Sequence, residues 1–245
     1  MKILILGGTT EASALAVALA ARNADFILSL AGATQSPRQP VPFRMGGFGG
    51  VAGLRAYLAE AKITHVVDAT HPFAAQMSAH AALASAYMGV PLVQLSRPAW
   101  QAEAGDDWHE VESVEAAARA IGTAPRRIFL SHGKEIAPFA AYPQHVYIIR
   151  TIDPPPGLAA LPQHRLILAR GPFDFADERD LLRGKHIDLI ITKNSGGGAT
   201  YAKIEAARAL NIPVILIRRP APQACPQAHS IADVLVWLAV HDAAP

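Results

Sequence analysis

Short apolar runs alternate along the chain with longer stretches rich in alanine and leucine. Residues 3–6 are all apolar and are followed by Gly7 and Gly8, a pattern typical of a parallel strand buried on both faces. Residues 12–21 favour a helix because alanine and leucine have high helix propensity. The same alternation predicts strands at 26–30, 64–68 and 91–95 and helices at 51–61 and 74–88.

The alternation stops between residues 97 and 107, where Pro98, Gly105 and two aspartates interrupt it. We interpret this segment as the link between two domains, at 1–97 and 98–245. Beyond the link the pattern predicts strands at 127–130, 146–149, 165–168, 188–192 and 213–217 and helices at 135–141, 177–182, 200–210 and 231–240. Strands that alternate with helices indicate an α/β fold with right-handed crossovers. The expected architecture is two Rossmann-like domains with mainly parallel sheets and an active site in the cleft between them.

Composition narrows the class of protein. Apolar residues make up 51% of the chain and charged residues 17%, which argues against disorder. The 22 basic and 20 acidic residues nearly balance, so no nucleic-acid partner is expected. Cys225 is the only cysteine, which excludes an internal disulfide and a cysteine zinc cluster, and no metal site is predicted. No signal-peptide pattern or run of about 18 apolar residues occurs, so we expect a cytoplasmic protein without a membrane span.

A glycine turn follows the first predicted strand. Gly7, Gly8, Thr9 and Thr10 join that strand to the first predicted helix. Ligands of open α/β sheets bind beyond the carboxyl ends of the strands, where helix amino termini offer N–H groups to phosphate. The turn lacks the full G-x-G-x-x-G pattern, and Glu11 would repel a phosphate. A dinucleotide site and a simple tight turn therefore both stay open.

The end of the second predicted strand lacks the acidic residue that holds the ribose 2′-hydroxyl in NAD-binding folds. Ser29, Thr34 and Arg38 are instead candidates for a 2′-phosphate, and Gly32 lies among them. This composition favours NADPH over NADH if a dinucleotide binds. The alternative is that the segment is a plain loop.

Two further segments carry candidate residues in the first domain. Residues 46–50 place four glycines around Phe48, so Gly47 is a candidate for close approach of a ligand, with a hinge as the alternative. Residues 68–74 follow the third predicted strand and hold five candidates: Asp68, Ala69, Thr70, His71 and Phe73. His71 can donate a proton or a hydrogen bond near neutral pH. A structural histidine bonded to Asp68 is the alternative.

The second domain repeats the strand, glycine and helix arrangement at residues 192–203. Lys193, Ser195, Gly196 and Lys203 lie in this segment, whose backbone amides and cations suit carboxylates or phosphate. Lys134 and Arg170 lie at other predicted strand ends of the same domain. We therefore expect an anion site on this domain.

These motifs together resemble the precorrin-6A reductase family. The shared strings, in the same order, are Leu-Gly-Gly-Thr-Thr-Glu-Ala at 6–12, the glycine run at 46–50, Asp-Ala-Thr-His-Pro-Phe-Ala at 68–74 and Thr-Lys-Asn-Ser-Gly at 192–196. The Arg-Gly-Pro-Phe string at 170–173 is also similar. The resemblance covers nearly the whole chain, and the strings at 68–74 and 192–196 are its most diagnostic parts.

The resemblance implies NADPH-dependent reduction of a double bond of precorrin-6A, giving precorrin-6B in cobalamin biosynthesis. It implies two Rossmann-like domains and a tetrapyrrole polycarboxylate as substrate, and close relatives use the cobalt-containing intermediate. The implied cofactor residues are Gly7, Gly8, Thr9, Thr10, Ser29, Gly32, Thr34, Arg38, Gly47, Asp68, Ala69 and Thr70. The implied substrate residues are His71, Phe73, Lys134, Arg170, Lys193, Ser195 and Gly196, with His71, Tyr201 and Lys203 as candidate proton donors.

One departure from the family concerns the 2′-phosphate. Many relatives have arginine where this chain has Ala33. If that arginine holds the 2′-phosphate in the relatives, either Arg38 or Arg22 substitutes for it here or the preference for NADP is weaker. Two other functions are alternatives to this one. A short-chain dehydrogenase needs Tyr-x-x-x-Lys, whereas Tyr201 and Lys203 are two positions apart. A catalytically silent NADP sensor has no need for a second anion site, but fold alone does not exclude it. Oligomeric state stays open.

Overall fold

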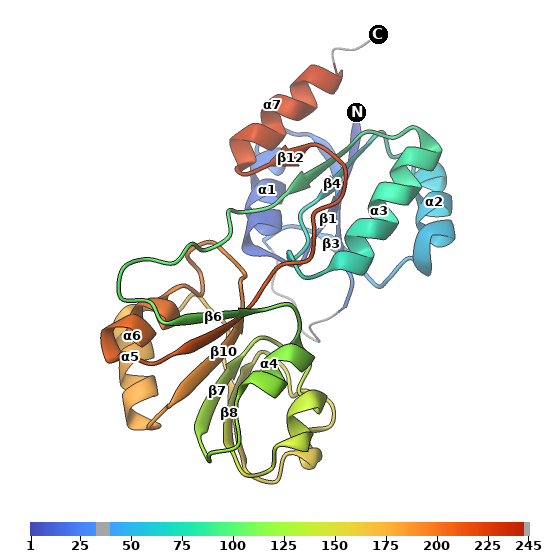
Figure 1. Cartoon of the computed structure of the whole chain (residues 1–245). Coiled ribbons are helices and arrows are strands. Elements are labelled where there is room, and N and C mark those ends of the chain that lie inside the picture. Colours follow the sequence, from blue (N-terminus) through green and yellow to red (C-terminus); the bar gives the residue numbers. More distant parts are fainter. Residues whose placement is uncertain (33–39, 243–245) are drawn as a thin grey trace. The chain divides into compact units, whose positions relative to one another are not determined.

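The computed structural model describes residues 1–32 and 40–242. The chain divides into two compact units, one formed by Met1–Pro98 with residues 220–245 and the other by Ala99–Arg219. Each unit contains one six-stranded sheet, and every strand pair in both sheets is parallel. Figure 1 shows the strands and helices of each unit. The prediction of two parallel α/β folds is confirmed.

The first unit has the strand order β12-β5-β4-β1-β2-β3. Its strands are β1 (Lys2–Leu6), β2 (Asp25–Leu30), β3 (Phe43–Met45), β4 (His65–Asp68), β5 (Leu92–Leu95) and β12 (Gln227–Ala228). Its helices are α1 (Thr10–Ala20), α2 (Gly50–Glu60), α3 (Ala75–Met88) and α7 (Ile231–Asp242). Helices α1 and α7 pack on one face of this sheet, and α2 and α3 pack on the other.

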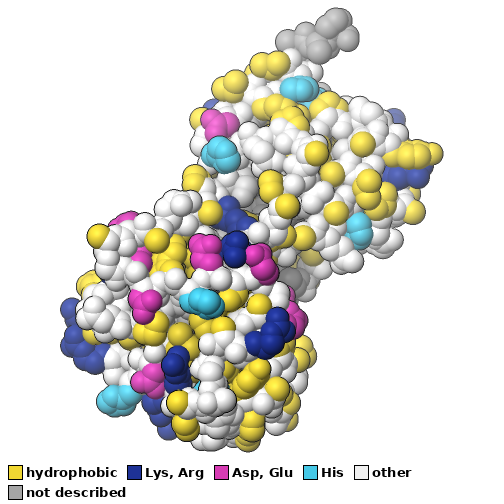
Figure 2. Space-filling view, in the orientation of Figure 1, with side chains coloured by type: hydrophobic (Ala, Val, Ile, Leu, Met, Phe, Trp, Pro, Cys, Tyr) yellow, Lys and Arg dark blue, Asp and Glu magenta, His cyan; other side chains and the backbone are white. Residues whose placement is uncertain are grey.

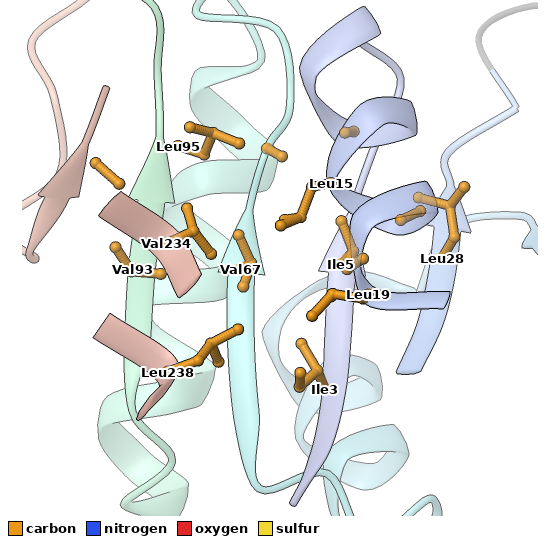
Figure 3. Close-up of a cluster of buried hydrophobic side chains, with 14 of the residues drawn as sticks. Ile3, Ile5, Leu15, Leu19, Leu28, Val67, Val93, Leu95, Val234 and Leu238 are labelled. Atoms are coloured by element: carbon orange, nitrogen blue, oxygen red, sulfur yellow. The ribbon is translucent and has the colours of Figure 1, made fainter. Parts of the chain in front are cut away.

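The all-apolar sequence of β1 follows from its place in the middle of this sheet. Ile3 and Ile5 point toward α1 and α7, whereas Leu4 and Leu6 point toward α2 and α3. Figure 3 shows the first of these clusters, in which the labelled side chains are Ile3, Ile5, Leu15, Leu19, Leu28, Val67, Val93, Leu95, Val234 and Leu238. A strand covered on both faces cannot alternate apolar with polar residues, so it reads as a continuous apolar run.

The second unit has the strand order β6-β11-β10-β7-β8-β9. Its strands are β6 (Trp108–Val111), β7 (Arg127–Ser131), β8 (Val146–Thr151), β9 (His164–Leu168), β10 (Leu189–Lys193) and β11 (Val214–Ile217). Its α-helices are α4 (Val114–Ala120), α5 (Phe175–Gly184) and α6 (Ala202–Leu210), and it has short 3₁₀ helices at Ala137–Ala141 and Leu158–Ala160. Helices α5 and α6 pack together over Phe129, Ile148 and Ile190 of the sheet.

The carboxyl-terminal segment departs from the predicted division of the chain. The sequence places residues 98–245 in the second domain, whereas residues 220–245 belong to the first unit. Strand β12 pairs with β5, with Gln227 opposite Gln94 and Ala228 opposite Leu95. Val234 of α7 then joins the core of the first unit. A two-residue strand leaves no periodic signal in a sequence, so this return of the chain was not predictable from pattern.

Several other elements differ from prediction. The helix expected at 135–141 is a 3₁₀ helix over Ala137–Ala141. The strands β3 and β6 and the helix α4 were not predicted. β6 has the sequence Trp-His-Glu-Val, which is too polar to resemble a buried strand, and β3 is three residues long.

Charged side chains of both signs lie on the surface. Figure 2 shows Lys and Arg side chains interspersed with Asp and Glu side chains on the visible face. Among residues 1–32 and 40–242, no helix has the length and apolar character needed to span a bilayer.

Candidate functional site

The glycine turn after β1 packs closely against β2. A Cβ atom on Gly7 would lie 2.8 Å from Leu28 Cδ1 and 3.2 Å from Leu30 Cδ2. The Gly7 amide donates a hydrogen bond of 2.8 Å to the Ser29 carbonyl oxygen. Gly8 has a φ of 122°, a conformation that L side chains rarely adopt, and a Cβ there would contact nothing within 4 Å. The turn therefore leaves open space above the end of β1.

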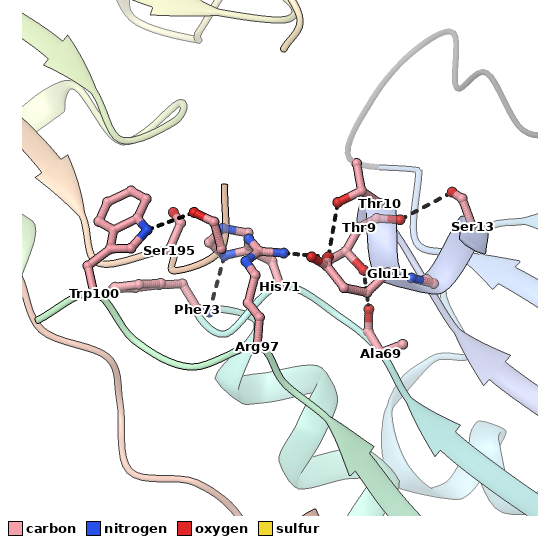
Figure 4. Close-up of polar contacts among 12 residues, drawn as sticks. Thr9, Thr10, Glu11, Ser13, Ala69, His71, Phe73, Arg97, Trp100 and Ser195 are labelled. Atoms are coloured by element: carbon pink, nitrogen blue, oxygen red, sulfur yellow. Dashed lines mark hydrogen bonds and ion pairs between the residues drawn. The ribbon is translucent and has the colours of Figure 1, made fainter. Parts of the chain in front are cut away.

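Thr9 caps helix α1 and ties it to the end of β4. Its hydroxyl accepts a hydrogen bond from the Ala12 amide at 3.1 Å. It donates one to the Ala69 carbonyl at 2.8 Å (Figure 4). A threonine in this position satisfies an amide that the helix leaves unpaired. Thr10 is exposed, and its hydroxyl donates to Glu11 Oε2 at 3.1 Å. Thr9 therefore shapes the turn, and Thr10 is the threonine at its surface.

The carboxylate of Glu11 has a cationic partner. Arg97 Nη1 lies 2.6 Å from Glu11 Oε2 within the same unit (Figure 4). An unpaired Glu11 would repel a phosphate at the start of α1, as expected from the sequence. The ion pair offsets the negative charge of Glu11, so the start of α1 can accept a phosphate.

A pocket lies at the carboxyl edge of the first sheet. Its lining residues come from β1, β2, the β3–α2 connection, the segment after β4 and α3: Leu6, Gly7, Ser29, Ala31, Gly46, Gly47, Phe48, Thr70 and Met77. Four of the predicted cofactor residues, Gly7, Ser29, Gly47 and Thr70, thus line one pocket although they are far apart in sequence. Open α/β sheets bind ligands at this edge.

The remaining predicted cofactor residues take other positions. Asp68 is 2% exposed, and its Oδ1 accepts hydrogen bonds from the Thr70 hydroxyl at 2.6 Å and the Thr70 amide at 3.1 Å. Asp68 therefore holds Thr70 in place from a buried position. Gly32 follows β2 with a φ of 83°. Thr34 and Arg38 lie outside the described residues.

His71 follows the same strand. It is half-buried, and its Nδ1 accepts a hydrogen bond from the Phe73 amide at 3.3 Å (Figure 4). The two rings lie 5.7 Å apart between centroids. The backbone bond sets the orientation of the imidazole and leaves Nε2 as its second polar atom.

Arg44 of β3 was not among the predicted residues. It is opposite Ser29 in the parallel register of β2 and β3, and its Nη1 donates a hydrogen bond of 2.6 Å to Ser29 Oγ. Its guanidinium carbon lies 4.3 Å from the Phe48 ring centroid and 5.0 Å from that of Tyr57. Sequence reasoning missed it because a three-residue strand gives no clear pattern. The feature of the sequence that could have indicated Arg44 is its place two positions before the glycine run at 46–50.

Arg22, in contrast, was predicted from the sequence but lies far from the pocket. It follows α1 and precedes Asp25, which is opposite Lys2 where β1 and β2 begin. Arg22 is therefore at the amino edge of the sheet, opposite to the pocket. The expectation that it substitutes for the missing arginine at position 33 is wrong.

The second unit places two predicted cations near the carboxyl ends of neighbouring strands. Lys193 Nζ lies 3.0 Å from Glu135 Oε1, and Lys134 Nζ lies 3.4 Å from Asp153 Oδ2. Because β10 pairs with β7, these groups gather at one edge of the sheet. Both cations thus have carboxylate partners.

The other predicted residues of this unit lie around the same edge. Ser195 Oγ donates to the Lys193 carbonyl at 3.4 Å, and Gly196 has a φ of 66°. Arg170 is exposed in the segment after β9.

Asn194 and Trp100 fix the loop that carries Ser195 and Gly196. The Asn194 side chain accepts from the Trp100 amide at 2.8 Å and donates to the Trp100 carbonyl at 3.1 Å. The Trp100 indole N–H donates to the Gly197 carbonyl at 2.8 Å (Figure 4). Neither residue was among the predicted site residues: Trp100 lies in the link at 97–107, which carries no periodic pattern, and Asn194 lies within the string at 192–196 without a role assigned to it. They act on the loop backbone and hold its shape.

Tyr201 and Lys203 belong to this scaffold. The Tyr201 hydroxyl donates to Glu103 at 3.0 Å and accepts from Arg208 at 2.8 Å, and burial raises its pKa. Lys203 is 2% exposed, and its Nζ donates to the Thr200 carbonyl at 2.7 Å and lies 4.8 Å from the Trp100 ring centroid. Burial, aided by repulsion from Arg150, lowers the Lys203 pKa to about 7. The pKa suits proton transfer, whereas the burial favours a structural role.

Within residues 1–32 and 40–242, no group of three His, Cys, Asp or Glu side chains is arranged to hold a metal ion.

The fold and the pocket define a Rossmann-like α/β protein whose first unit has the features of a dinucleotide site. An open glycine turn, a capped helix and a neutralised first-turn carboxylate all fit a diphosphate. A family model described as precorrin-6x reductase CbiJ/CobK matches residues 2–239, and the chain belongs to this family. The family consists of oxidoreductases that act on a tetrapyrrole macrocycle, and their chemistry implies a nicotinamide cofactor.

Individual relatives agree with the family. The chain is 49% identical over 246 residues to a precorrin-6A reductase of Rhodobacter capsulatus, covering 100% of this chain and 98% of the relative. It is 48% identical to a solved structure named CobK precorrin-6A reductase, with a TM-score of 0.95 and coverage of 100% and 98%. A cobalt-precorrin-6A reductase of Priestia megaterium is 28% identical over 232 residues, covering 89% and 90%.

Proposed function

We propose that this protein uses NADPH to reduce a double bond of precorrin-6A, giving precorrin-6B in cobalamin biosynthesis, in the cytoplasm. The observation that carries the proposal is the pocket at the carboxyl edge of the first sheet, in a chain similar over its whole length to precorrin-6A reductases. When bound, the nicotinamide cofactor supplies the hydride. The chain's own residues bind and orient the cofactor and the substrate and neutralise their negative charges.

The first unit is proposed to hold the cofactor. Gly7 and Gly8 let the diphosphate approach the start of α1, where helix amides point outward. Gly47 and Thr70 line the same pocket, with Thr70 held by Asp68. Ala69 contributes its carbonyl to Thr9, and Gly32 allows the turn after β2.

NADPH is proposed rather than NADH because the second strand ends without an acid. No Asp or Glu occurs between Asp25 and Glu60, so no carboxylate of this segment is available for a ribose 2′-hydroxyl. A 2′-phosphate in the same place meets a positively charged segment. Ser29, Thr34 and Arg38 are the residues that the sequence proposes for it.

The second unit is proposed to bind acetate and propionate groups of the macrocycle. Lys134 and Lys193 have carboxylate partners in Asp153 and Glu135, and a substrate carboxylate can take the place of either partner. Arg170, Ser195 and Gly196 are proposed to add donors at the same edge. His71 and Phe73 of the first unit are proposed as further substrate residues.

A proton must reach the macrocycle for each hydride that is transferred. His71 is the first candidate because it is half-buried and oriented through Nδ1. Tyr201 and Lys203 remain candidates, although their hydrogen bonds hold the loop of the second unit.

The metal-free intermediate is proposed as the substrate. Identity is 49% to the precorrin-6A reductase of Rhodobacter capsulatus and 28% to the cobalt-precorrin-6A reductase of Priestia megaterium. A chain specialised for the cobalt form is expected to show the opposite order.

The test compares four mixtures of purified protein with NADPH or NADH and with precorrin-6A or its cobalt form. Cofactor absorbance and the visible spectrum of the pigment are followed together. The expected result is fast oxidation of NADPH with a matching change of the metal-free pigment. If NADPH binds but neither pigment is reduced, the reductase proposal fails and an NADP sensor becomes the better account.

A further inference from the structure

We infer that Arg44, together with Ser29, binds the 2′-phosphate of NADPH and so sets the preference for NADPH over NADH. The inference rests on the proposed function, since it assigns a residue to one group of the proposed cofactor. Neither the family strings nor the strand pattern of the sequence pointed to Arg44. The contact between Arg44 and Ser29 did.

The position of Arg44 follows from sheet geometry. In Rossmann-like units the diphosphate lies at the end of β1 and the adenosine ribose lies beyond the end of the neighbouring strand. Here that neighbour is β2, and Arg44 of β3 is opposite Ser29 near the carboxyl end of β2. Ser29 itself lines the pocket. The guanidinium is therefore at the place where a ribose 2′-substituent is expected.

Aromatic stacking holds the guanidinium in place. Arg44 lies over the rings of Phe48 and Tyr57, whose centroids are 4.3 Å and 5.0 Å from its guanidinium carbon. The two rings also contact each other, with centroids 5.1 Å apart. Stacking against an aromatic face leaves the N–H edge of a guanidinium available for an oxyanion. Phe48 lines the pocket as well, so the stacked arginine is beside it.

The charge around Arg44 also suits a phosphate. Among the described residues, the guanidinium has Ser29 Oγ as its hydrogen-bond acceptor and no carboxylate partner. The sequence from Phe26 to Ala59 contains no acid. A hydroxyl is a weak partner for a guanidinium, and a phosphate dianion accepts two such N–H groups at once. Ser29 can then donate its own hydrogen to the same phosphate.

The test measures equilibrium binding by calorimetry, without turnover. The titrants are NADP⁺ and NAD⁺, and the fragments adenosine 2′,5′-bisphosphate and adenosine 5′-monophosphate. The proteins are the wild type, Arg44→Gln, Arg44→Lys, Ser29→Ala and Arg38→Gln. Arg22→Gln is the matched control, because it removes the same charge from an exposed arginine at the opposite edge of the same sheet.

The wild type is expected to prefer each 2′-phosphorylated ligand. Arg44→Gln is expected to weaken NADP⁺ and the bisphosphate about 10- to 100-fold, the range for loss of a charged hydrogen-bonding group, and to change NAD⁺ and the monophosphate less than about twofold. Arg44→Lys restores part of the loss because it keeps the charge. Ser29→Ala has a smaller effect of the same selectivity, and Arg22→Gln has none.

Three results overturn the inference. The first is equal weakening of phosphorylated and unphosphorylated ligands by Arg44→Gln, which assigns Arg44 a structural role. The second is an unchanged preference in Arg44→Gln. The third is a selective loss in Arg38→Gln alone, which assigns the phosphate to Arg38. A wild type that binds none of the four ligands contradicts the proposed function itself, and is distinct from all three.

Discussion

Arg97 and Glu11 form an ion pair, with 2.6 Å between Nη1 and Oε2, at the first turn of the helix that follows the glycine turn. Acidic side chains are favourable in the first turn of an isolated helix, because the helix dipole places partial positive charge there. A diphosphate bound at the same turn is repelled by that carboxylate. Pairing with Arg97 reconciles the two requirements, since it leaves the helix with its acid and reduces the net charge near the turn.

Replacement of Arg97 by Gln is expected to weaken dinucleotide binding about two- to fivefold, because it exposes the phosphate to an unpaired Glu11. The double variant Glu11→Gln/Arg97→Gln is expected to bind within about twofold of the wild type, since both charges are gone. Fluorescence titration with NADPH measures both. Equal weakening in the single and double variants contradicts the account.

Gly53 of α2 is expected to tolerate no side chain. A Cβ there would lie 1.6 Å from the Phe48 carbonyl oxygen. Gly53→Ala is therefore expected to lower the free energy of unfolding by more than about 3 kcal/mol and to abolish dinucleotide binding, because Phe48 lines the pocket. Gly184→Ala is the control: it meets nothing within 4 Å in α5 and is expected to be neutral or to stabilise by up to about 1 kcal/mol. If Gly53→Ala is as stable as the wild type and still binds the dinucleotide, the steric role assigned to Gly53 is wrong.

Lys203 makes stability depend on pH in a defined direction. Its pKa is about 7 in the folded chain, whereas an unfolded lysine has a pKa of about 10.4. Between these values the unfolded state binds more protons, so this group makes stability rise as pH increases from about 7 to about 10. Urea unfolding of the wild type and of Lys203→Met at several pH values measures the difference. The free energy of unfolding of the wild type is expected to rise relative to that of the variant between about pH 7 and pH 10. If the difference between the two proteins stays constant over this range, Lys203 is charged in the folded chain and the account is contradicted.

The ion pair of Arg150 and Glu178 is buried, with side-chain exposures of 5% and 3%. Glu178→Gln leaves the buried Arg150 guanidinium without its anion and is expected to cost about 3–5 kcal/mol. Arg150→Met is expected to cost less, because Lys203 remains beside Glu178. Equilibrium denaturation measures both, and the reverse order contradicts this view of the cluster.

Much of the fold was predictable because its central strands are covered on both faces. The apolar run of β1 and the alanine-rich stretches of α1 and α3 follow directly from burial. The edge of the sheet was harder to predict. β12 is two residues long, and its pairing with β5 depends on a contact between residues 228 and 95 that no local pattern encodes.

The candidate site shows the same division. Gly7, Ser29 and Thr70 were expected at the carboxyl edge because each ends or follows a predicted strand, and Gly47 because its glycine run precedes a predicted helix. All four line one pocket, and their role in cofactor binding stays a prediction. Arg44 was not predictable, because its contact with Ser29 requires the register of β3 on β2. The ion pair of Arg97 with Glu11 was not predictable either, because the two residues are far apart in the sequence and meet only in the folded chain.

The most direct test of the central claim follows one hydrogen atom. The protein is incubated with precorrin-6A and NADPH that carries deuterium at the nicotinamide C4 position, in separate runs for the two faces of the ring. The reduced pigment is then analysed by mass spectrometry. The account predicts that one of the two labelled cofactors transfers one deuterium to the macrocycle, together with one proton from solvent or protein. A pigment that is reduced without deuterium from either cofactor, or is not reduced at all, contradicts it.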